Sequence, residues 1–210
     1  MYQTGEFYHV YNRGIEKRKV FMDDKDYYRF LESLREFNCE KPVGSLRFMK
    51  QMRQDNLIKE GDHGEKIVRI IAYCLNPNHY HLLLKQLVDG GISEFLKRMG
   101  GYTKYINEKY DRSGVLFQGK SKKKQIKSSY LLSHMSAYIN GNPEIHGYAK
   151  AEHWPWSSCR HYLGHEKSDI CSIHEIMKDF NGLSEYKRHL SQVIKESGQI
   201  KKEIKTFLLE

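Results

Sequence analysis

The chain has 210 residues, a length that suits one domain with a hydrophobic core and is too short for two large ones. Its 35 lysines and arginines against 26 acidic residues give a formal charge of +9, which favours a polyanionic partner, first of all nucleic acid. The four cysteines form no Cys-x-x-Cys pair, the polar start resembles no signal peptide, and no apolar run approaches the ~20 residues of a membrane helix, so we expect a cytoplasmic protein without a membrane partner.

The first predicted elements are a strand and a helix. Residues 6–13, EFYHVYNR, alternate bulky and polar side chains as a strand does, and the strand closes at Gly14 before a basic turn. From Asp23 to Phe37, acidic residues precede bulky ones at helical spacing, which predicts an amphipathic helix. Residues 39–66 are polar and aperiodic, so they predict an irregular insertion with one short helix or strand.

Two adjacent apolar segments predict a hairpin at the centre of a sheet. Residues 66–75, KIVRIIAYCL, are β-branched and nearly continuous, and residues 79–87, HYHLLLKQL, follow across a tight Asn-Pro-Asn turn. Because side chains alternate along a strand, we expect His79 and His81 on one face of the sheet and Tyr80 on the other.

The remaining elements follow from helical spacing, turn residues and basic runs. We predict a helix over 92–110, which Gly100 and Gly101 weaken, and then a strand with a basic end over 114–126. A serine-capped helix over 128–141 follows, and the Gly141–Pro143 region stops it. The tail 171–210 is predicted to form two lysine-rich helices separated by Gly182.

This order of elements predicts an α+β fold of the ferredoxin-like kind. We expect a sandwich with a central antiparallel sheet and helices on one face, plus a C-terminal helical tail. The predicted organisation is one catalytic domain at 1–165, with the irregular insertion at 39–66, and the helical tail at 166–210.

The two strand histidines become informative through their surroundings. Imidazole commonly binds divalent metals, but two histidines at this spacing are by themselves more often core or surface residues. The stretch YCLNPNHYHLLL resembles the His-hydrophobic-His motif of the single-tyrosine HUH transposases, the REP-associated and insertion-sequence types. Further stretches match in the expected order over about residues 6–164: FYHVYNRG, GGYTKYINEKY, GVLFQGKSKKKQI, YLLSHMSAYINGNPEIHG and WPWSS.

Two features depart from the family pattern. Tyr80 stands where an aliphatic residue is more common, and the 39–66 segment is longer than in the shortest members. Neither departure touches a position that the resemblance assigns to a metal ligand.

The resemblance implies a metal-dependent transposase that cuts and rejoins single-stranded, hairpin-flanked DNA. In this family, a tyrosine on a late helix attacks a phosphodiester to give a 5′-phosphotyrosine and a free 3′-OH. The matching tyrosine is Tyr138, and the implied ligands of a Mg²⁺ or Mn²⁺ ion are His79, His81 and Asn142. A phenol, with a pKa of about 10, can serve both as nucleophile and as leaving group when the strand is rejoined.

Two of these assignments have structural alternatives. Without the resemblance, Tyr138 is more simply a core aromatic residue. Asn142 stands four positions later and so shares its helix face. It could instead cap the helix carbonyls or stabilise the turn before Pro143.

Basic residues near the proposed site are predicted to contact DNA phosphates, although solvated surface charge is the ordinary explanation of such runs. They form two clusters and a single arginine in the NRG turn. The predicted set is Arg13, Lys17, Arg18, Lys19, Lys120, Lys122, Lys123, Lys124 and Lys127.

Two other functions fit the same residues. One is a nicking enzyme of the replication-initiator or relaxase type, which shares the two-histidine chemistry; the small size and the tyrosine placed after the metal strand weigh against it. The other is a domesticated, catalytically silent protein that binds hairpin DNA. The sequence leaves the oligomeric state open between a monomer and a homodimer.

Overall fold

The computed structural model describes residues 2–41, 44–55, 57 and 64–207. Its centre is a four-stranded antiparallel sheet in the order β2-β3-β1-β4. The strands are β1 (Phe7–Arg13), β2 (Val68–Asn76), β3 (His79–Gln86) and β4 (Lys122–Ile126). The α+β class and the central antiparallel sheet are therefore confirmed. The β2–β3 hairpin forms as predicted, but only β3 is central, because β2 lies at an edge of the sheet.

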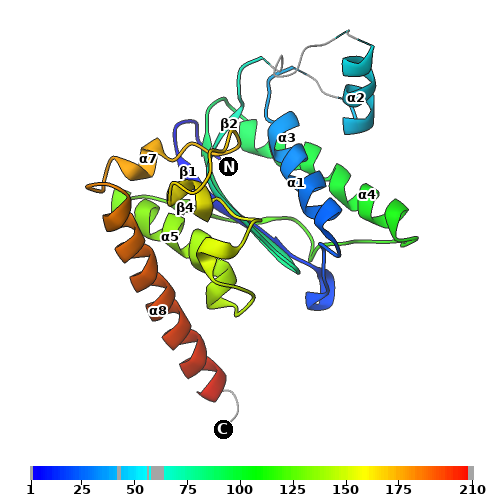
Figure 1. Cartoon of the computed structure of the whole chain (residues 1–210). Helices are drawn as coiled ribbons and strands as arrows, with labels where there is room; N and C mark the ends of the chain where they lie inside the picture. The colour runs from blue at the N-terminus through cyan, green and yellow to red at the C-terminus, as the bar shows by residue number, and fades with distance from the viewer. Residues whose placement is uncertain (1, 42–43, 56, 58–63, 208–210) are drawn as a thin grey trace.

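Helices cover both faces of the sheet, so the prediction of helices on one face is wrong (Figure 1). On one face lie α1 (Asp24–Glu36), α3 (Gly91–Met99) and α4 (Gly101–Lys109); on the other lie α5 (Ser129–Ile145) and α8 (Leu183–Phe207). The reason is in the strands themselves. Leu82 and Leu84 of β3 belong to one buried cluster and Leu83 belongs to the other, so each face needs its own cover.

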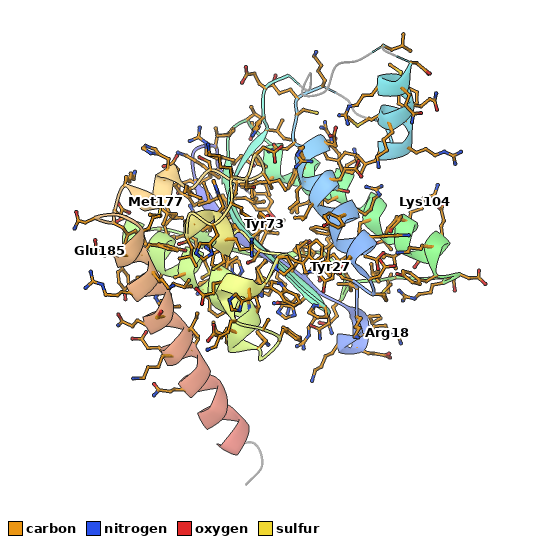
Figure 2. The ribbon with its side chains drawn as sticks, in the orientation of Figure 1. Arg18, Tyr27, Tyr73, Lys104, Met177 and Glu185 are labelled. Carbon is orange, nitrogen blue, oxygen red and sulfur yellow. The ribbon has the colours of Figure 1, made fainter. Side chains whose placement is uncertain are left out.

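The interior is built largely from aromatic and aliphatic side chains. Figure 2 shows Tyr27 and Tyr73 within the body of the protein and Arg18, Lys104 and Glu185 at its periphery. Tyr27 and Tyr73 are 6% and 4% exposed. The short remaining elements are a 3-10 turn η1 (Ile15–Lys17), α2 (Leu46–Gln54), a 3-10 turn η2 (Ala151–His153), α6 (Cys159–Tyr162) and α7 (His174–Met177).

Helix α1 forms where the sequence predicted it. Asp23 caps its first turn in a reciprocal capping box with Asp26. The Asp26 carboxylate is fully buried and accepts hydrogen bonds from the hydroxyls of Tyr105 and Tyr110 and from Lys109. This network joins the start of α1 to the end of α4.

Two predicted elements differ in extent. The helix expected over 92–110 is divided at Gly100 into α3 and α4. The strand expected over 114–126 is confined to β4, and Phe117 only forms an isolated bridge with Gly14 beside the end of β1. Helix α2 is the short helix expected within 39–66; residues 42–43, 56 and 58–63 of that segment lie outside the described residues.

Helix α5 does not stop at the Gly141–Pro143 region, which corrects the sequence prediction. It continues to Ile145 with Pro143 inside, and Gly147, at φ +74°, follows its end. Gly141 serves helix packing instead, because a Cβ there would come within 2.5 Å of the Ile194 side chain of α8. The close approach of α8 therefore explains why position 141 is a glycine, which in the sequence alone indicates the end of the helix.

The C-terminal segment contains two helices on either side of Gly182, as predicted, although α7 is only one turn long. Helix α8 packs on α5, and the buried Tyr186 hydroxyl accepts a hydrogen bond from Asn140 of α5. The division between 1–165 and 166–210 stays a prediction. Among the described residues, no helix has the length and apolar character needed to cross a membrane.

Candidate active site on the α5 face of the sheet

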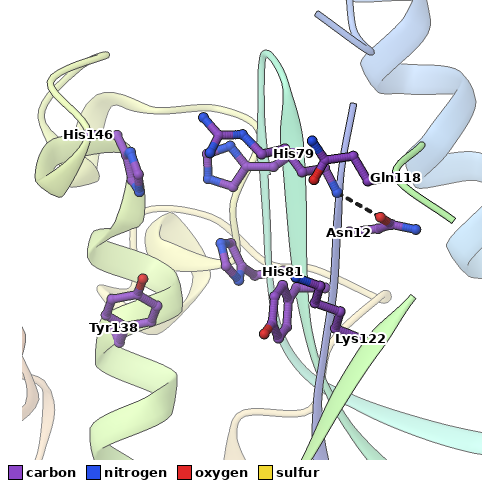
Figure 3. Close-up of a pocket in the computed structure, with 9 residues that line it drawn as sticks. Asn12, His79, His81, Gln118, Lys122, Tyr138 and His146 are labelled. Atoms are coloured by element: carbon purple, nitrogen blue, oxygen red, sulfur yellow. Dashed lines mark hydrogen bonds between the residues drawn. The ribbon is translucent and has the colours of Figure 1, made fainter. Parts of the chain in front are cut away.

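Strand pairing brings the two motif histidines to one cavity. His79 lies opposite Arg13 and His81 lies opposite Tyr11 in the β1–β3 register. The predicted alternation is confirmed, since Tyr80 packs on the other face among residues that include Phe30 and Phe117. The cavity measures about 270 Å³ and is lined by Tyr11, Asn12, Arg13, His79, His81, Gln118, Lys122, Tyr138 and His146 (Figure 3).

Tyr138 reaches this cavity from α5. Figure 3 shows its ring facing His81 across the cavity, with the hydroxyl directed toward the end of the helix that precedes His146. The ring centroids of Tyr138 and His81 are 5.9 Å apart at an interplanar angle of 85°. Burial raises the pKa of the Tyr138 phenol, and a hydrogen bond with the Asn142 side chain acts in the opposite direction. The structure therefore places this tyrosine beside the histidines and not solely in the core.

Asn142 lies one helical turn beyond Tyr138 and is fully buried. Its Oδ1 accepts a hydrogen bond of 2.6 Å from Asn76 Nδ2 and lies 3.1 Å from His79 Nε2. Its Nδ2 has no hydrogen-bond partner at standard distance, although the amide is close enough to the phenol to lower the Tyr138 pKa. These contacts point the side chain into the site, which disfavours a role as a helix cap.

The tautomer of His79 is assigned from its contact with Asn78. Nδ1 lies 2.6 Å from Asn78 Oδ1, an acceptor, so we assign the proton to Nδ1. Nε2 then presents a lone pair, and it lies 3.0 Å from Asn76 Nδ2. The Asn76 amide group donates to both Nε2 of His79 and Oδ1 of Asn142, two acceptors that face each other.

This pair of acceptors has the spacing of two metal ligands. Neighbouring ligands of an octahedral ion bound at roughly 2.1 Å are about 3 Å apart, close to the 3.1 Å between His79 Nε2 and Asn142 Oδ1. In the structure, the Nδ2 hydrogens of Asn76 bring partial positive charge to these two acceptors, as a bound cation would. The residues therefore fit a divalent metal, which would compete with Asn76 for the same two atoms.

His81 is oriented by a second buried histidine. Its Nδ1 is 2.8 Å from His9 Nε2, so this contact leaves Nε2 of His81 for a ligand. Desolvation, followed by the neighbouring histidines, holds the pKa of His81 well below its usual value. Burial and then Lys124 lower the pKa of His9 to about 4. Both rings are therefore neutral at pH 7, the form in which imidazole binds metals.

The proposed metal ligands differ from a cluster of His, Cys, Asp or Glu side chains. Within the described part of the chain, no three His, Cys, Asp or Glu side chains gather as a metal group. The site combines two imidazoles with an amide oxygen, and imidazole favours Mn²⁺ whereas oxygen donors also suit Mg²⁺. The Mg²⁺ or Mn²⁺ ligands His79, His81 and Asn142 stay a prediction that this arrangement supports.

The predicted DNA-binding residues lie in different parts of the structure. Arg13 and Lys122 line the cavity, and the buried Nε of Arg13 has no hydrogen-bond partner. Lys124 lies opposite His9 on the same face, whereas Lys123 lies on the other face and contacts the Tyr2 ring at 4.1 Å.

The other predicted lysines and arginines are exposed and do not line the cavity. Lys17, Arg18 and Lys19 lie in and after η1, where Arg18 forms an ion pair with Glu16. Lys120 precedes β4 and Lys127 follows it. The role of all nine residues in DNA binding stays a prediction.

Several residues that line the cavity or contact its histidines were not singled out from the sequence. His9 and Tyr11 have the same alternation as Arg13 on β1, so the period of the strand was a usable signal for both. Tyr11 is a second tyrosine in the cavity, and its ring stacks on His81 with centroids 5.8 Å apart. No sequence pattern pointed to Asn76 or His146. These residues lie at the ends of β2 and α5, and they approach His79 only in the folded structure.

Comparisons with known proteins give one informative likeness. No protein-family model and no curated protein matches the sequence. The fold is similar to a solved structure of a REP-associated tyrosine transposase bound to a REP hairpin. The two share 16% sequence identity with a TM-score of 0.53, over 86% of this chain and 92% of that one. At this identity the likeness shows a shared fold.

Proposed function

We propose that this protein is a metal-dependent transposase that cuts and rejoins single-stranded, hairpin-flanked DNA through a covalent 5′-phosphotyrosine at Tyr138. The observation that carries the proposal is the meeting of Tyr138, His79 and His81 at one cavity, from elements far apart in the sequence, with the Asn142 side chain in contact with both His79 and Tyr138. The likeness in fold to a hairpin-bound tyrosine transposase supports a DNA hairpin as partner.

The proposed cleavage is a transesterification. The Tyr138 oxygen attacks phosphorus, forms a new P–O bond and displaces the 3′-oxygen of the preceding nucleotide. The phenolic proton is lost to solvent or a neighbouring base, and the departing 3′-oxygen takes up a proton. Because one phosphodiester replaces another, the attack of a 3′-OH on the phosphotyrosine rejoins the strand without a nucleotide cofactor.

The residues of the site divide this work. His79, His81 and Asn142 would hold Mg²⁺ or Mn²⁺, which when bound polarises the scissile phosphate and stabilises its developing charge. Asn142 also acts on Tyr138, because its Nδ2 is placed to donate to the phenolate, and this interaction lowers the Tyr138 pKa. Arg13 and Lys122 supply positive charge on the β1–β4 side of the cavity, where the DNA backbone would lie.

A single-stranded substrate suits this site. Tyr138 is half-buried and the histidines are 7% exposed, so a phosphate must enter a cavity of about 270 Å³ to reach them. A flexible single strand can do this while lysines follow its backbone. The described chain supplies both the tyrosine and the histidines, which supports a site built within one molecule, whether the protein is a monomer or a homodimer.

A pool of hairpin oligonucleotides with single-stranded flanks tests the proposal. With Mn²⁺ present, the protein should form a covalent adduct that survives denaturing electrophoresis and chelation, and added 3′-OH strands should release it as joined product. Binding without an adduct would favour the silent hairpin-binding protein. An adduct that added 3′-OH strands do not release would contradict the proposed rejoining step.

A further inference from the structure

A second cavity lies on the opposite face of the sheet, between α3, α4 and the segment that leads into β4. This far-face cavity measures about 810 Å³, within the usual size of small-ligand sites. Its lining includes three aromatic residues and three lysines: Tyr2, Tyr80, Phe117, Lys97, Lys120 and Lys123.

The far-face cavity is connected to the active site through shared elements. Tyr80 of β3 lies between His79 and His81 in sequence and projects to the opposite face. Asn12 lines both cavities, and its Nδ2 donates a hydrogen bond of 3.0 Å to the carbonyl oxygen of Gly119. The segment 117–121 therefore separates the two cavities at the β4 edge of the sheet.

The lining of the far-face cavity combines aromatic rings with positive charge. Phe117 packs edge-on against Tyr80, with ring centroids 5.5 Å apart, and Lys123 lies over the Tyr2 ring. The charged lining residues are the three lysines, and none of the described lining residues is acidic. Lys97 is paired with Glu94 at 3.5 Å, whereas neither Lys120 nor Lys123 forms an ion pair with another described residue. Aromatic surfaces with unpaired cations at the rim are the features that bind unpaired nucleotides.

The lysines of β4 alternate around the edge of the sheet. Lys122 and Lys124 pair with Tyr11 and His9 and so share the face of the active site, whereas Lys123 faces the far-face cavity. Because β4 is an edge strand, a flexible polyanion can pass around it and meet lysines on both faces. One polar group of the lining is the Tyr80 hydroxyl, which lies 2.8 Å from Ser121 Oγ and can exchange this partner for the edge of a base.

We propose that the far-face cavity binds one or two unpaired bases of the same DNA strand that is cleaved at Tyr138, with the backbone crossing the β4 edge between the two cavities. The inference rests on the proposed function, because it takes single-stranded DNA as the ligand. It gives Tyr80, the residue that departs from the aliphatic pattern of the motif, a place in substrate recognition.

Photocrosslinking of the full-length protein tests this proposal. The probe is oligo(dT)16 with a single 4-thiothymidine moved along the strand, and each crosslink is assigned to a single residue by fragmentation in the mass spectrometer. Crosslinks at Tyr2, Tyr80 or Phe117 themselves support the proposal. Crosslinks restricted to active-site residues such as Tyr11 and Tyr138 overturn it and leave the proposed function intact. If the wild-type protein binds no DNA probe, including the hairpin pool, both ideas fail.

A matched pair of variants gives an independent measurement. Phe117→Leu keeps apolar bulk but removes the ring, and it should weaken oligo(dT)16 binding roughly fivefold to tenfold in fluorescence anisotropy. Phe48→Leu, the same change at a 56% exposed ring on α2, should leave the affinity unchanged. Equal affinities of the two variants would overturn the proposal, provided that both have the wild-type circular dichroism spectrum; the crosslinking result stands if Phe117→Leu does not fold.

Discussion

Nε2 of His79 and Oδ1 of Asn142 lie 3.1 Å apart, and with the proton assigned to Nδ1 of His79 both atoms are hydrogen-bond acceptors. Asn76 resolves the conflict by donating to both from a single amide group. Two lone pairs directed at one region of a buried site attract positive charge. This relationship supports a cation at the cavity, and it makes Asn142 the most informative of the proposed ligands to change.

Asn142→Asp should convert the site into a tighter metal site that is less stable when empty. The new carboxylate is buried beside His79 and Asn76, so we expect a loss of about 1–3 kcal/mol in the free energy of unfolding without metal. Added Mn²⁺ should restore it, because a ligand that binds only the folded state stabilises that state. Thermal unfolding with and without Mn²⁺ measures this. A variant whose unfolding temperature is unaffected by Mn²⁺ would remove Asn142 from the ligand set.

His79→Ala and His81→Ala should each abolish metal-dependent DNA cleavage. Each change removes a nitrogen ligand from the proposed site, and Mn²⁺ affinity, measured by electron paramagnetic resonance, should fall at least tenfold. His161→Ala is the matched control, since that histidine lies in α6, does not line the cavity, and its Nδ1 contacts the backbone carbonyl of Glu166. Full cleavage by either motif variant would argue against metal bound by the two imidazoles.

Lys122→Gln should reduce both DNA affinity and its dependence on salt. Each phosphate neutralised on a single strand contributes about 0.7 to the slope of log affinity against log salt concentration. One lost contact should lower the slope by roughly that amount. Lys104→Gln, at a lysine of α4 with 81% side-chain exposure, should leave the slope unchanged. Identical slopes for both variants would place the DNA backbone away from β4.

The contact between α5 and α8 should give stability a dependence on pH. Burial and then the neighbouring His134 lower the pKa of His189 on α8, with the Ser133 carbonyl and Glu196 acting in the opposite direction. The unfolded chain, with an ordinary histidine pKa of about 6.5, then binds the proton more readily than the folded chain. Stability from this group is therefore complete above pH 6.5 and is lost as the pH falls below it.

Urea unfolding between pH 5 and 8 measures this effect in wild type and in His189→Leu. The variant should show a shallower loss of stability at acid pH, because it lacks the group whose proton uptake favours unfolding. Parallel curves for the two proteins would show that His189 titrates normally. The result bears on activity because α8 supports the helix that carries Tyr138.

The sequence predicted what depends on local periodicity and missed what depends on contacts between distant segments. The alternation of His79, Tyr80 and His81 was readable because a strand has a period of two. The run of leucines on β3 also indicates a strand that is buried on both faces, and therefore helices on both sides of the sheet. This signal was not used in the prediction of the fold.

The errors at α5 have a tertiary cause. Gly141 and Pro143 are ordinary stop signals for a helix, and the packing of α8 against Gly141 explains why a glycine stands inside α5. In the site, Tyr138 and Asn142 were reached through family resemblance. Asn76 and the His9 contact to His81 appear only when β1, β2 and β3 are paired, so no single stretch of sequence contains them.

The cavity contains two tyrosines, Tyr138 and Tyr11, and the central claim is that only Tyr138 is the nucleophile. The most direct measurement is the yield of covalent protein–DNA adduct for Tyr138→Phe and Tyr11→Phe, with hairpin oligonucleotides and Mn²⁺ and with DNA binding followed in parallel. We predict that Tyr138→Phe binds DNA and forms no adduct, whereas Tyr11→Phe still forms one. An undiminished adduct in Tyr138→Phe would contradict the account.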